Sequence, residues 1–183
     1  EAAIVAELGK FLLNGGLYKG VKPVMWSVVE KTALAEAEVE YLDHTSTTVW
    51  VRFPVVKASK PELKDASVVI WTTTPWTLPA NRAVAYGAEF DYVAIEILKT
   101  ADGSLAKVGE KIVVAKALLS DVARDAGIAE HRVLAEFTGE ALAGTVCAHP
   151  FRGADKGYGF DVPLLASGHV TTDTGTGFVH IAP

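Results

Sequence analysis

The sequence has only one cysteine, Cys147, among its 183 residues. A disulfide framework and a cysteine-based zinc site both need more cysteines, so both are excluded, and a reducing, cytosolic setting is favoured. Histidines are also few, and His44, His131 and His169 lie far apart without the spacing of metal ligands. We therefore expect no metal in this chain.

Long apolar runs and an excess of positive charge are missing as well. The longest stretch without Asp, Glu, Lys or Arg, residues 66–81, contains two prolines and four threonines and is too short to span a membrane. The net charge of −5 and the pI near 5.5 exclude the basic surface of a general nucleic-acid binder, but not a local contact with one nucleic-acid end. Hydrophobic residues make up 50% of the chain, which is ample for a folded core.

The two ends of the sequence favour a domain cut from a longer polypeptide. The sequence begins at Glu1 without a recognisable signal peptide, and its only methionine is Met25. Apolar residues continue to Pro183, so no tail is visible. We expect a lead-in helix and linker over residues 1–20 and one globular domain over residues 21–183, truncated at its C-terminal end.

The hydrophobic patterns predict many strands and few helices. Apolar residues at helical spacing predict a helix over residues 1–14. The β-prone runs 39–42 and 48–55 predict a hairpin, with Pro54 at its end or on an edge. A second helix is expected over residues 115–126. Further strands are expected at residues 67–71, 90–98, 111–114, 131–137, 161–166 and 176–181.

Strand follows strand in this order, which argues against a doubly wound α/β sheet. The pattern favours a β-rich α+β domain. We expect its core to be a closed or nearly closed β-barrel with a few peripheral helices.

Residues 71–81, Trp-Thr-Thr-Thr-Pro-Trp-Thr-Leu-Pro-Ala-Asn, gather hydroxyl groups between a strand and a turn. Pro75 favours a first helical position, with Thr74 as the N-cap. A β-branched strand followed by a capping threonine would account for part of this pattern. A cap needs only one threonine, however, and three precede Pro75. Because hydroxyls both donate and accept, such a cluster can also hold a polar substrate or a water molecule.

A second segment, residues 173–183, combines two glycines with a histidine. Gly175 and Gly177 allow the backbone to approach a ligand closely. His180 could transfer a proton or orient a water molecule, although a lone histidine is more often structural. Cys147 and His149 form a third candidate, a nucleophile and its base two residues apart, but the small apolar neighbours of Cys147 favour a buried structural cysteine. Glycine-rich nucleotide-binding motifs are absent.

The first two segments together resemble the editing domain of isoleucyl-tRNA synthetases, which is inserted into a class I catalytic fold. Residues 71–81 are similar to the threonine-rich editing peptide, and Gly175-Thr-Gly-Phe-Val-His-Ile-Ala-Pro183 is similar to the second signature. Residues 22–27, 31–41 and 160–163 also match, so the resemblance runs from about residue 16 to residue 183. Valyl- and leucyl-type enzymes usually carry Thr-Thr-Arg-Pro followed by an acid. Here Thr74 precedes and Trp76 follows Pro75, which favours the isoleucyl type.

The resemblance implies hydrolysis of mischarged Val-tRNA(Ile), with valyl-adenylate as a second possible substrate. An isoleucine pocket cannot strongly reject valine, and this enzyme family is a known case in which a second, hydrolytic site removes the error. Thr72, Thr73 and Thr74 would hold the attacking water, the aminoacyl group and the terminal ribose. His180 would restrict the side-chain pocket or position the water. Trp76 would shape a wall of the pocket or contact the terminal adenosine, and Asn81 would hydrogen-bond the substrate or brace the threonine-rich segment. Substrate-binding roles are also expected for Gly177, Phe178 and Val179.

The family resemblance sets expectations for partners and cofactors too. The partners would be the aminoacylated 3′ end of tRNA(Ile), its valine moiety and the rest of the synthetase, in a monomeric cytoplasmic protein. No cofactor is expected in this domain, since ATP and magnesium belong to the synthetic site of the parent enzyme. The family holds the substrate's α-amino group with an aspartate beyond Pro183, so we expect this chain alone to be impaired in that step. A module that docks the tRNA 3′ end without chemistry is the alternative.

Overall fold

A computed structural model describes all residues, 1–183, and the chain divides into two compact units, Glu1–Thr45 and Ser46–Pro183. The first unit contains helix α1 (Ala2–Leu13) and a short hairpin of β1 (Trp26–Ser27) and β2 (Thr32–Ala33), followed by the 3-10 helix η1 (Glu36–Glu38). The expected lead-in helix is therefore present. The compact units divide after Thr45, and the domain boundary expected between residues 20 and 21 stays a prediction.

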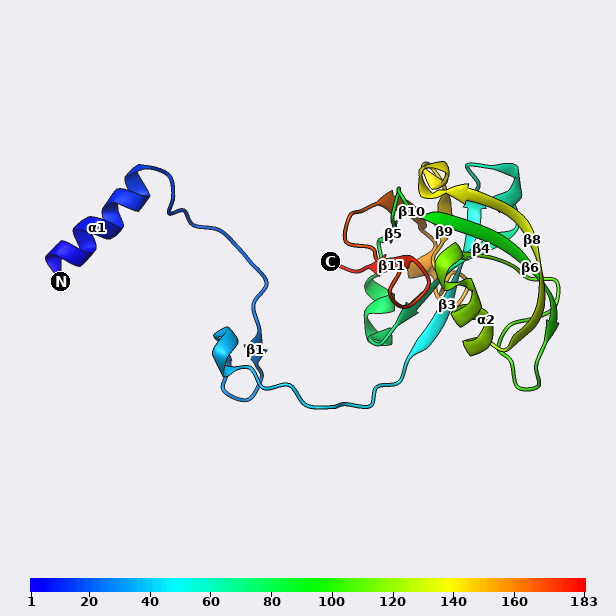
Figure 1. Ribbon diagram of the computed structural model, residues 1–183, viewed down its shortest axis with the longest axis horizontal. Helices are drawn as coiled ribbons and strands as arrows, with labels where there is room; N and C mark the ends of the chain where they lie inside the picture. Colours follow the sequence, from blue (N-terminus) through cyan, green and yellow to red (C-terminus); the bar gives the residue numbers. More distant parts are fainter. The chain divides into compact units, whose positions relative to one another are not determined.

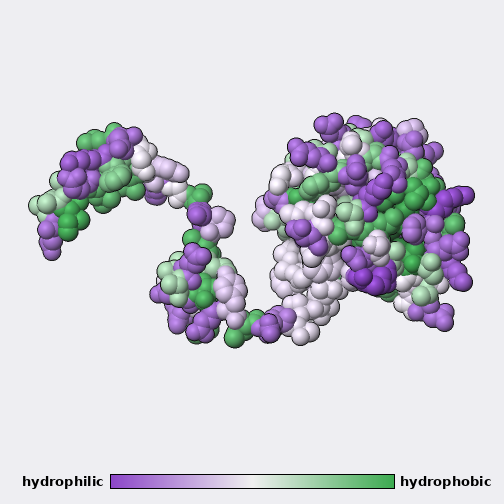
Figure 2. All heavy atoms as spheres, in the orientation of Figure 1, coloured by the Kyte–Doolittle hydropathy of each residue, from purple (hydrophilic) through white to green (hydrophobic).

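Helix α1 buries none of its residues within this unit. Its apolar positions, among them Leu8 and Phe11, are more than half exposed, and Figure 2 shows hydrophobic atoms on the surface of this helix. Lys10 pairs with Glu7 on the polar side at 2.6 Å. The helix thus has the amphipathic pattern that its sequence predicts.

The second unit, Ser46–Pro183, is built around a nine-stranded mixed sheet in the order β11-β5-β10-β9-β3-β4-β7-β6-β8 (Figure 1). Most neighbours are antiparallel, but β4 pairs with β7 and β5 pairs with β10 in parallel. The strands are β3 (Val49–Lys57), β4 (Ala66–Thr72), β5 (Ala83–Tyr86), β6 (Asp91–Thr100), β7 (Lys111–Ala115), β8 (Ile128–Thr138), β9 (Val146–Ala148), β10 (Asp161–Ala166) and β11 (Phe178–Ile181).

Helical segments in this unit are short. The only α-helix is α2 (Leu119–Asp125), which directly follows the 3-10 helix η4 (Lys116–Leu118). The helix expected over residues 115–126 therefore exists in two parts. The remaining 3-10 helices are η2 (Pro61–Leu63), η3 (Pro75–Ala80), η5 (Gly139–Leu142) and η6 (Lys156–Tyr158).

The expected hairpin of residues 39–42 and 48–55 is wrong. No strand forms over residues 39–42, and β3 pairs instead with β4 and with the distant strand β9. Pro54 does not end the strand. It lies where β3 stops pairing with β4 and begins pairing with β9, next to a register irregularity, and such positions tolerate the missing N–H of proline.

The β-rich α+β class is confirmed, but a closed barrel is not. The ladder leaves β8 and β11 with one strand partner each. The sheet nevertheless curls, because the Ala115 amide at the end of β7 donates to the Thr176 carbonyl oxygen at 2.8 Å, just before β11. The curled sheet encloses a core of aliphatic and aromatic side chains, including Phe53, Ile70, Val84, Tyr92 and Ile95.

None of the helices is both long enough and apolar enough to cross a membrane.

Candidate functional site

The threonine-rich segment lies where β4 ends and η3 begins. Thr72 is the last residue of β4, and Pro75 occupies the first position of η3 after the N-cap residue Thr74. The predicted change from strand to helical turn is therefore confirmed. Thr74 does not cap η3 with its side chain. Its amide instead donates to the Thr72 hydroxyl oxygen at 3.0 Å, which folds the segment back on itself.

The hydroxyls of this segment bond to one another in an ordered way. The Thr72 and Thr74 hydroxyl oxygens lie 3.2 Å apart. Because Thr72 already accepts the Thr74 amide, its hydroxyl hydrogen can be donated to the Thr74 oxygen. The hydroxyl hydrogen of Thr74 is then available to another partner. Thr73 is exposed and takes no part in these hydrogen bonds, whereas Thr72 is buried and Thr74 is half-buried.

Strand β11 brings His180 to this segment. β11 pairs with β5 so that His180 lies opposite Val84. The imidazole Nε2 is then 3.0 Å from the Thr77 hydroxyl, which itself donates to the Thr74 carbonyl oxygen at 2.7 Å. Two segments 103 positions apart thereby meet in one hydrogen-bonded network.

The hydrogen bonds around His180 define its tautomer. The Thr77 hydroxyl gives its hydrogen to Thr74, so it can only accept from His180, and Nε2 must carry the ring hydrogen. Nδ1 then faces the Asn81 amide nitrogen at 3.5 Å as an acceptor. Burial lowers the pKa of His180 below its usual value, which keeps the ring neutral at pH 7. A neutral ring with both nitrogens engaged is suited to shaping a pocket.

Asn81 connects the threonine-rich segment to β11 from inside the protein. Its side chain is fully buried, and its amide nitrogen donates to the carbonyl oxygens of Ala83 at 2.8 Å and Ile181 at 3.4 Å. The Asn81 Oδ1 atom is buried without a hydrogen-bond partner. These contacts favour a bracing role for Asn81 over direct contact with a substrate.

The other expected substrate-binding residues lie in three different environments. Trp76 is 74% exposed on η3, where a nucleoside could stack on it. Phe178 is buried in the core, with its ring centroid 4.7 Å from that of Tyr92, so only its backbone is free to meet a substrate. Val179 follows on the opposite face of β11 from His180. Gly177 is buried, and its carbonyl oxygen accepts the Tyr92 hydroxyl at 2.7 Å.

Sequence reasoning missed two residues that organise this region. Thr77 lies in the threonine-rich segment, and its spacing of three from Thr74 is the signal that could have identified it. Tyr92 gave no such signal. Its hydroxyl, which accepts the Gly87 amide at 3.0 Å and donates to Gly177, links β6 to the loop before β11.

Cys147 and His149 do not form a nucleophile and base. Cys147 is fully buried, and this burial raises the pKa of its thiol to about 12. The Nδ1 atom of His149 accepts the Phe151 amide at 3.1 Å, so its Nε2 hydrogen is donated to the Leu78 carbonyl oxygen, also at 3.1 Å. His149 therefore holds η3 in place through the Leu78 carbonyl oxygen. The structural role favoured for Cys147 agrees with this arrangement.

Acidification should destabilise the Ser46–Pro183 unit through the buried His149 and the half-buried His180. Burial lowers the pKa of both His149 and His180 from 6.5. Below pH 6.5 the unfolded chain binds more protons than the folded chain, so stability is complete above this pH and is lost as pH falls towards the folded values. Urea midpoints at about pH 7.5 and about pH 5.5 should show this loss. His149→Gln should reduce it and His131→Gln on β8 should not; an equal loss in all three proteins would contradict the assignment.

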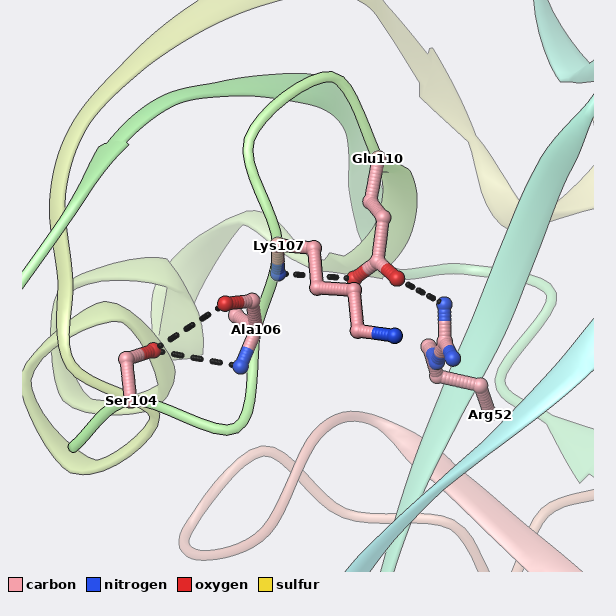
Figure 3. Close-up of polar contacts among 5 residues, drawn as sticks. All are labelled: Arg52, Ser104, Ala106, Lys107 and Glu110. Atoms are coloured by element: carbon pink, nitrogen blue, oxygen red, sulfur yellow. Dashed lines mark hydrogen bonds and ion pairs between the residues drawn. The ribbon is translucent and has the colours of Figure 1, made fainter.

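A cavity of about 360 Å³ lies next to α2, away from the network around His180. At its edge Arg52 forms an ion pair with Glu110, which also accepts the Lys107 amide at 3.0 Å (Figure 3). The Ser104 hydroxyl bonds the backbone of Ala106 in the same loop. These polar groups stabilise the loop between β6 and β7. No group of three or more His, Cys, Asp or Glu side chains in the chain could hold a metal ion.

Comparisons with known proteins identify the family of this chain. The family model described as tRNA synthetases class I (I, L, M and V) matches residues 1–168. The isoleucine–tRNA ligase of Gluconobacter oxydans is 54% identical over 185 residues, and that of Bradyrhizobium diazoefficiens is 52% identical over 183 residues. Both matches cover 100% of this chain but only 19% and 18% of the relatives, so the chain spans about a fifth of their length.

Solved structures support the fold. GlLeuRS-CP1 has a TM-score of 0.54 at 17% identity, covering 73% of this chain and 54% of that chain. The P.knowlesi cytosolic leucyl-tRNA synthetase editing domain has a TM-score of 0.56 at 11% identity, covering 76% and 59%. This chain therefore has the mixed, β-rich α+β architecture of those domains.

Proposed function

Since this chain belongs to the class I tRNA synthetases and corresponds along its whole length to a segment of isoleucine–tRNA ligases, we propose that it edits aminoacyl-tRNA. The reaction would be hydrolysis of the ester in Val-tRNA(Ile), with valyl-adenylate as a second substrate. The observation that carries this proposal is the network from His180 through Thr77 to Thr74 and Thr72. It unites the two segments that resemble the editing motifs.

The chemistry needs a water molecule, not a protein nucleophile. Water attacks the ester carbonyl carbon, the bond to the ribose oxygen breaks, and that oxygen takes a proton to leave valine and tRNA. The Thr74 hydroxyl, oriented by Thr72, would hold the water or the ester oxygen. No covalent intermediate is required, which fits a site of hydroxyls and an inert, buried Cys147.

Selectivity for valine would come from size. His180 is held on both ring nitrogens and is neutral, so it can act as a firm wall against the extra methylene of isoleucine. Trp76 on the exposed side of η3 would stack on the terminal adenosine. Thr73, Gly177, Phe178 and Val179 keep their expected roles in substrate contact as part of the proposal, Phe178 through its backbone.

The partners of this chain are proposed from its correspondence to a segment of isoleucine–tRNA ligases. The partners are the 3′ end of tRNA(Ile) and the remaining parts of a cytoplasmic synthetase, whose synthetic site would use ATP and magnesium. A net charge of −5 leaves little electrostatic attraction for a whole tRNA. We therefore assign most of the tRNA affinity to parts of the ligase outside this chain.

Hydrolysis of the two charged tRNAs tests the function directly. A full-length isoleucine–tRNA ligase carrying this chain in its corresponding segment should release valine from Val-tRNA(Ile) at least about tenfold faster than isoleucine from Ile-tRNA(Ile). Cys147→Ala should leave the rate within about twofold, because a buried thiol of high pKa is not a nucleophile.

Three other outcomes would change the conclusion. Loss of hydrolysis in Cys147→Ala with the fold intact would establish a cysteine hydrolase. Binding of tRNA without hydrolysis would leave a docking module for the tRNA 3′ end. Equal rates on both charged tRNAs would remove the valine selectivity while keeping the esterase.

A further inference from the structure

Arg82 differs from every other arginine in the chain. The sequence contains five arginines, and four of them form ion pairs with carboxylates. Arg82 has no carboxylate partner within ion-pair distance. Its guanidinium carbon lies instead 4.7 Å from the centroid of the Phe160 ring. The side chain is thus positioned by an aromatic ring while its charge stays free for another partner.

The backbone places Arg82 at the border of the candidate site. It follows Asn81 directly, and its amide donates to the Ile181 carbonyl oxygen at 2.8 Å. Ile181 in turn follows His180 on β11. Arg82 therefore joins the end of the threonine-rich segment to the strand that carries the histidine, and its exposed side chain begins at this junction.

The ring beneath Arg82 is itself held in place. The Phe160 carbonyl oxygen accepts from Arg152 at 2.6 Å, and the Phe160 ring centroid lies 5.1 Å from that of His149. His149 is hydrogen-bonded to Leu78 of η3. The Phe160 ring that Arg82 stacks on is therefore connected through His149 to the same 3-10 helix that follows the threonines.

Arg82 is the charge left in excess around Phe160. Arg152 beside Phe160 is paired with Asp161, and Lys156 on η6 follows Asp155 directly, so these charges cancel. Burial lowers the pKa of His149, and the positive charges of Arg82 and Arg152 lower it further. In a protein of net charge −5, an unpaired and pre-oriented guanidinium suits an anion that arrives from solution.

We propose that Arg82 binds a backbone phosphate of the single-stranded tRNA 3′ end as its terminal adenosine enters the site. The proposal rests on the proposed function. The guanidinium donates to phosphate oxygens in a planar fork, and stacking on Phe160 fixes the plane of that fork. The phosphate contact would compensate locally for the acidic surface and guide the 3′ end towards Thr74 and His180.

Salt dependence separates phosphate binding from a purely structural role. In a full-length ligase carrying this chain, Arg82→Gln should lower kcat/KM for deacylation of Val-tRNA(Ile) about tenfold at low salt. The slope of log kcat/KM against log salt should become shallower by about 0.7, the value for one phosphate contact on a single strand. Arg82→Lys should restore the slope, because it restores the charge. Arg132 on β8 is paired with Glu96, so Arg132→Gln is the matched control. It should change neither kcat/KM nor the salt slope.

The outcomes of this test distinguish the two proposals. An active wild-type enzyme with an unchanged rate and salt slope in Arg82→Gln would overturn the role of Arg82 and leave the editing function intact. A wild-type enzyme without hydrolysis would overturn the editing function. In that case, fluorescence anisotropy with a short single-stranded RNA ending in adenosine decides on Arg82. Equal affinity in wild type and Arg82→Gln would then reject the phosphate contact.

Discussion

Replacing Gly177 with alanine should lower the free energy of unfolding of the Ser46–Pro183 unit by about 3 kcal/mol. Gly177 has a φ of +78°, a left-handed conformation that costs any residue with a Cβ atom. A Cβ atom here would also lie 2.3 Å from the Cβ of Ala115 on β7. The backbone penalty and the steric overlap act together, and urea denaturation followed by circular dichroism should measure their sum.

Gly175 provides a matched control two residues earlier. It also has a positive φ, +83°, but a Cβ atom there would come no closer than 3.6 Å to the Trp71 ring, which is an ordinary contact. Gly175→Ala should therefore cost only the backbone term, about 1 kcal/mol. Equal losses in the two variants would mean that the close approach of Gly177 to β7 does not contribute to stability.

The Thr74→Ala variant should lower kcat/KM for deacylation of Val-tRNA(Ile) about 100-fold, in the full-length ligase carrying this chain. Thr74 is the residue whose hydroxyl hydrogen remains available once Thr72 has donated to it, so we expect it to hold the water or the ester oxygen. Loss of one such contact in a preorganised site typically has an effect of this size. Thr74→Ser keeps the hydroxyl and should retain most of the activity.

Two comparisons make the Thr74 result interpretable. Thr47→Ala removes an exposed hydroxyl before β3, outside the network, and should leave the rate unchanged. Thermal denaturation of each variant should show that the fold survives, because Thr74 is only half-buried. If Thr74→Ala hydrolyses Val-tRNA(Ile) within about twofold of the wild type, the proposed role of this hydroxyl is wrong.

Local sequence patterns predict the elements that local forces determine. The helix of residues 1–14, the strand before Thr72 and the turn at Pro75 depend on apolar spacing and on the fixed φ of proline. They appear close to their expected bounds. The threonine-rich segment and His180 could also be singled out from the sequence, and the structure brings them into one hydrogen-bonded network.

Local sequence patterns do not indicate which distant strands pair with one another. The β-prone residues 39–42 remain outside any sheet, because β3 finds its partners in β4 and in β9, some 90 positions further along the chain. The same holds within the site. No local pattern indicates that the Tyr92 hydroxyl donates to the Gly177 carbonyl oxygen, or that Arg82 stacks on the Phe160 ring. Both contacts arise only when segments far apart in the sequence meet.

His180 of β11 lies 103 positions after Thr77 of η3, and this separation gives the network around His180 an order of assembly. A chain made from its N-terminus folds with its early segments first, so β4 and η3 are present long before β11 emerges from the ribosome. Until then, His180 is missing from the site, and β5, whose four residues are all buried in the finished fold, has an open apolar edge. Such an edge is a template for pairing with other chains. Pairing of β11 with β5 therefore completes the hydrogen-bonded network around His180 and covers an aggregation-prone edge in a single step.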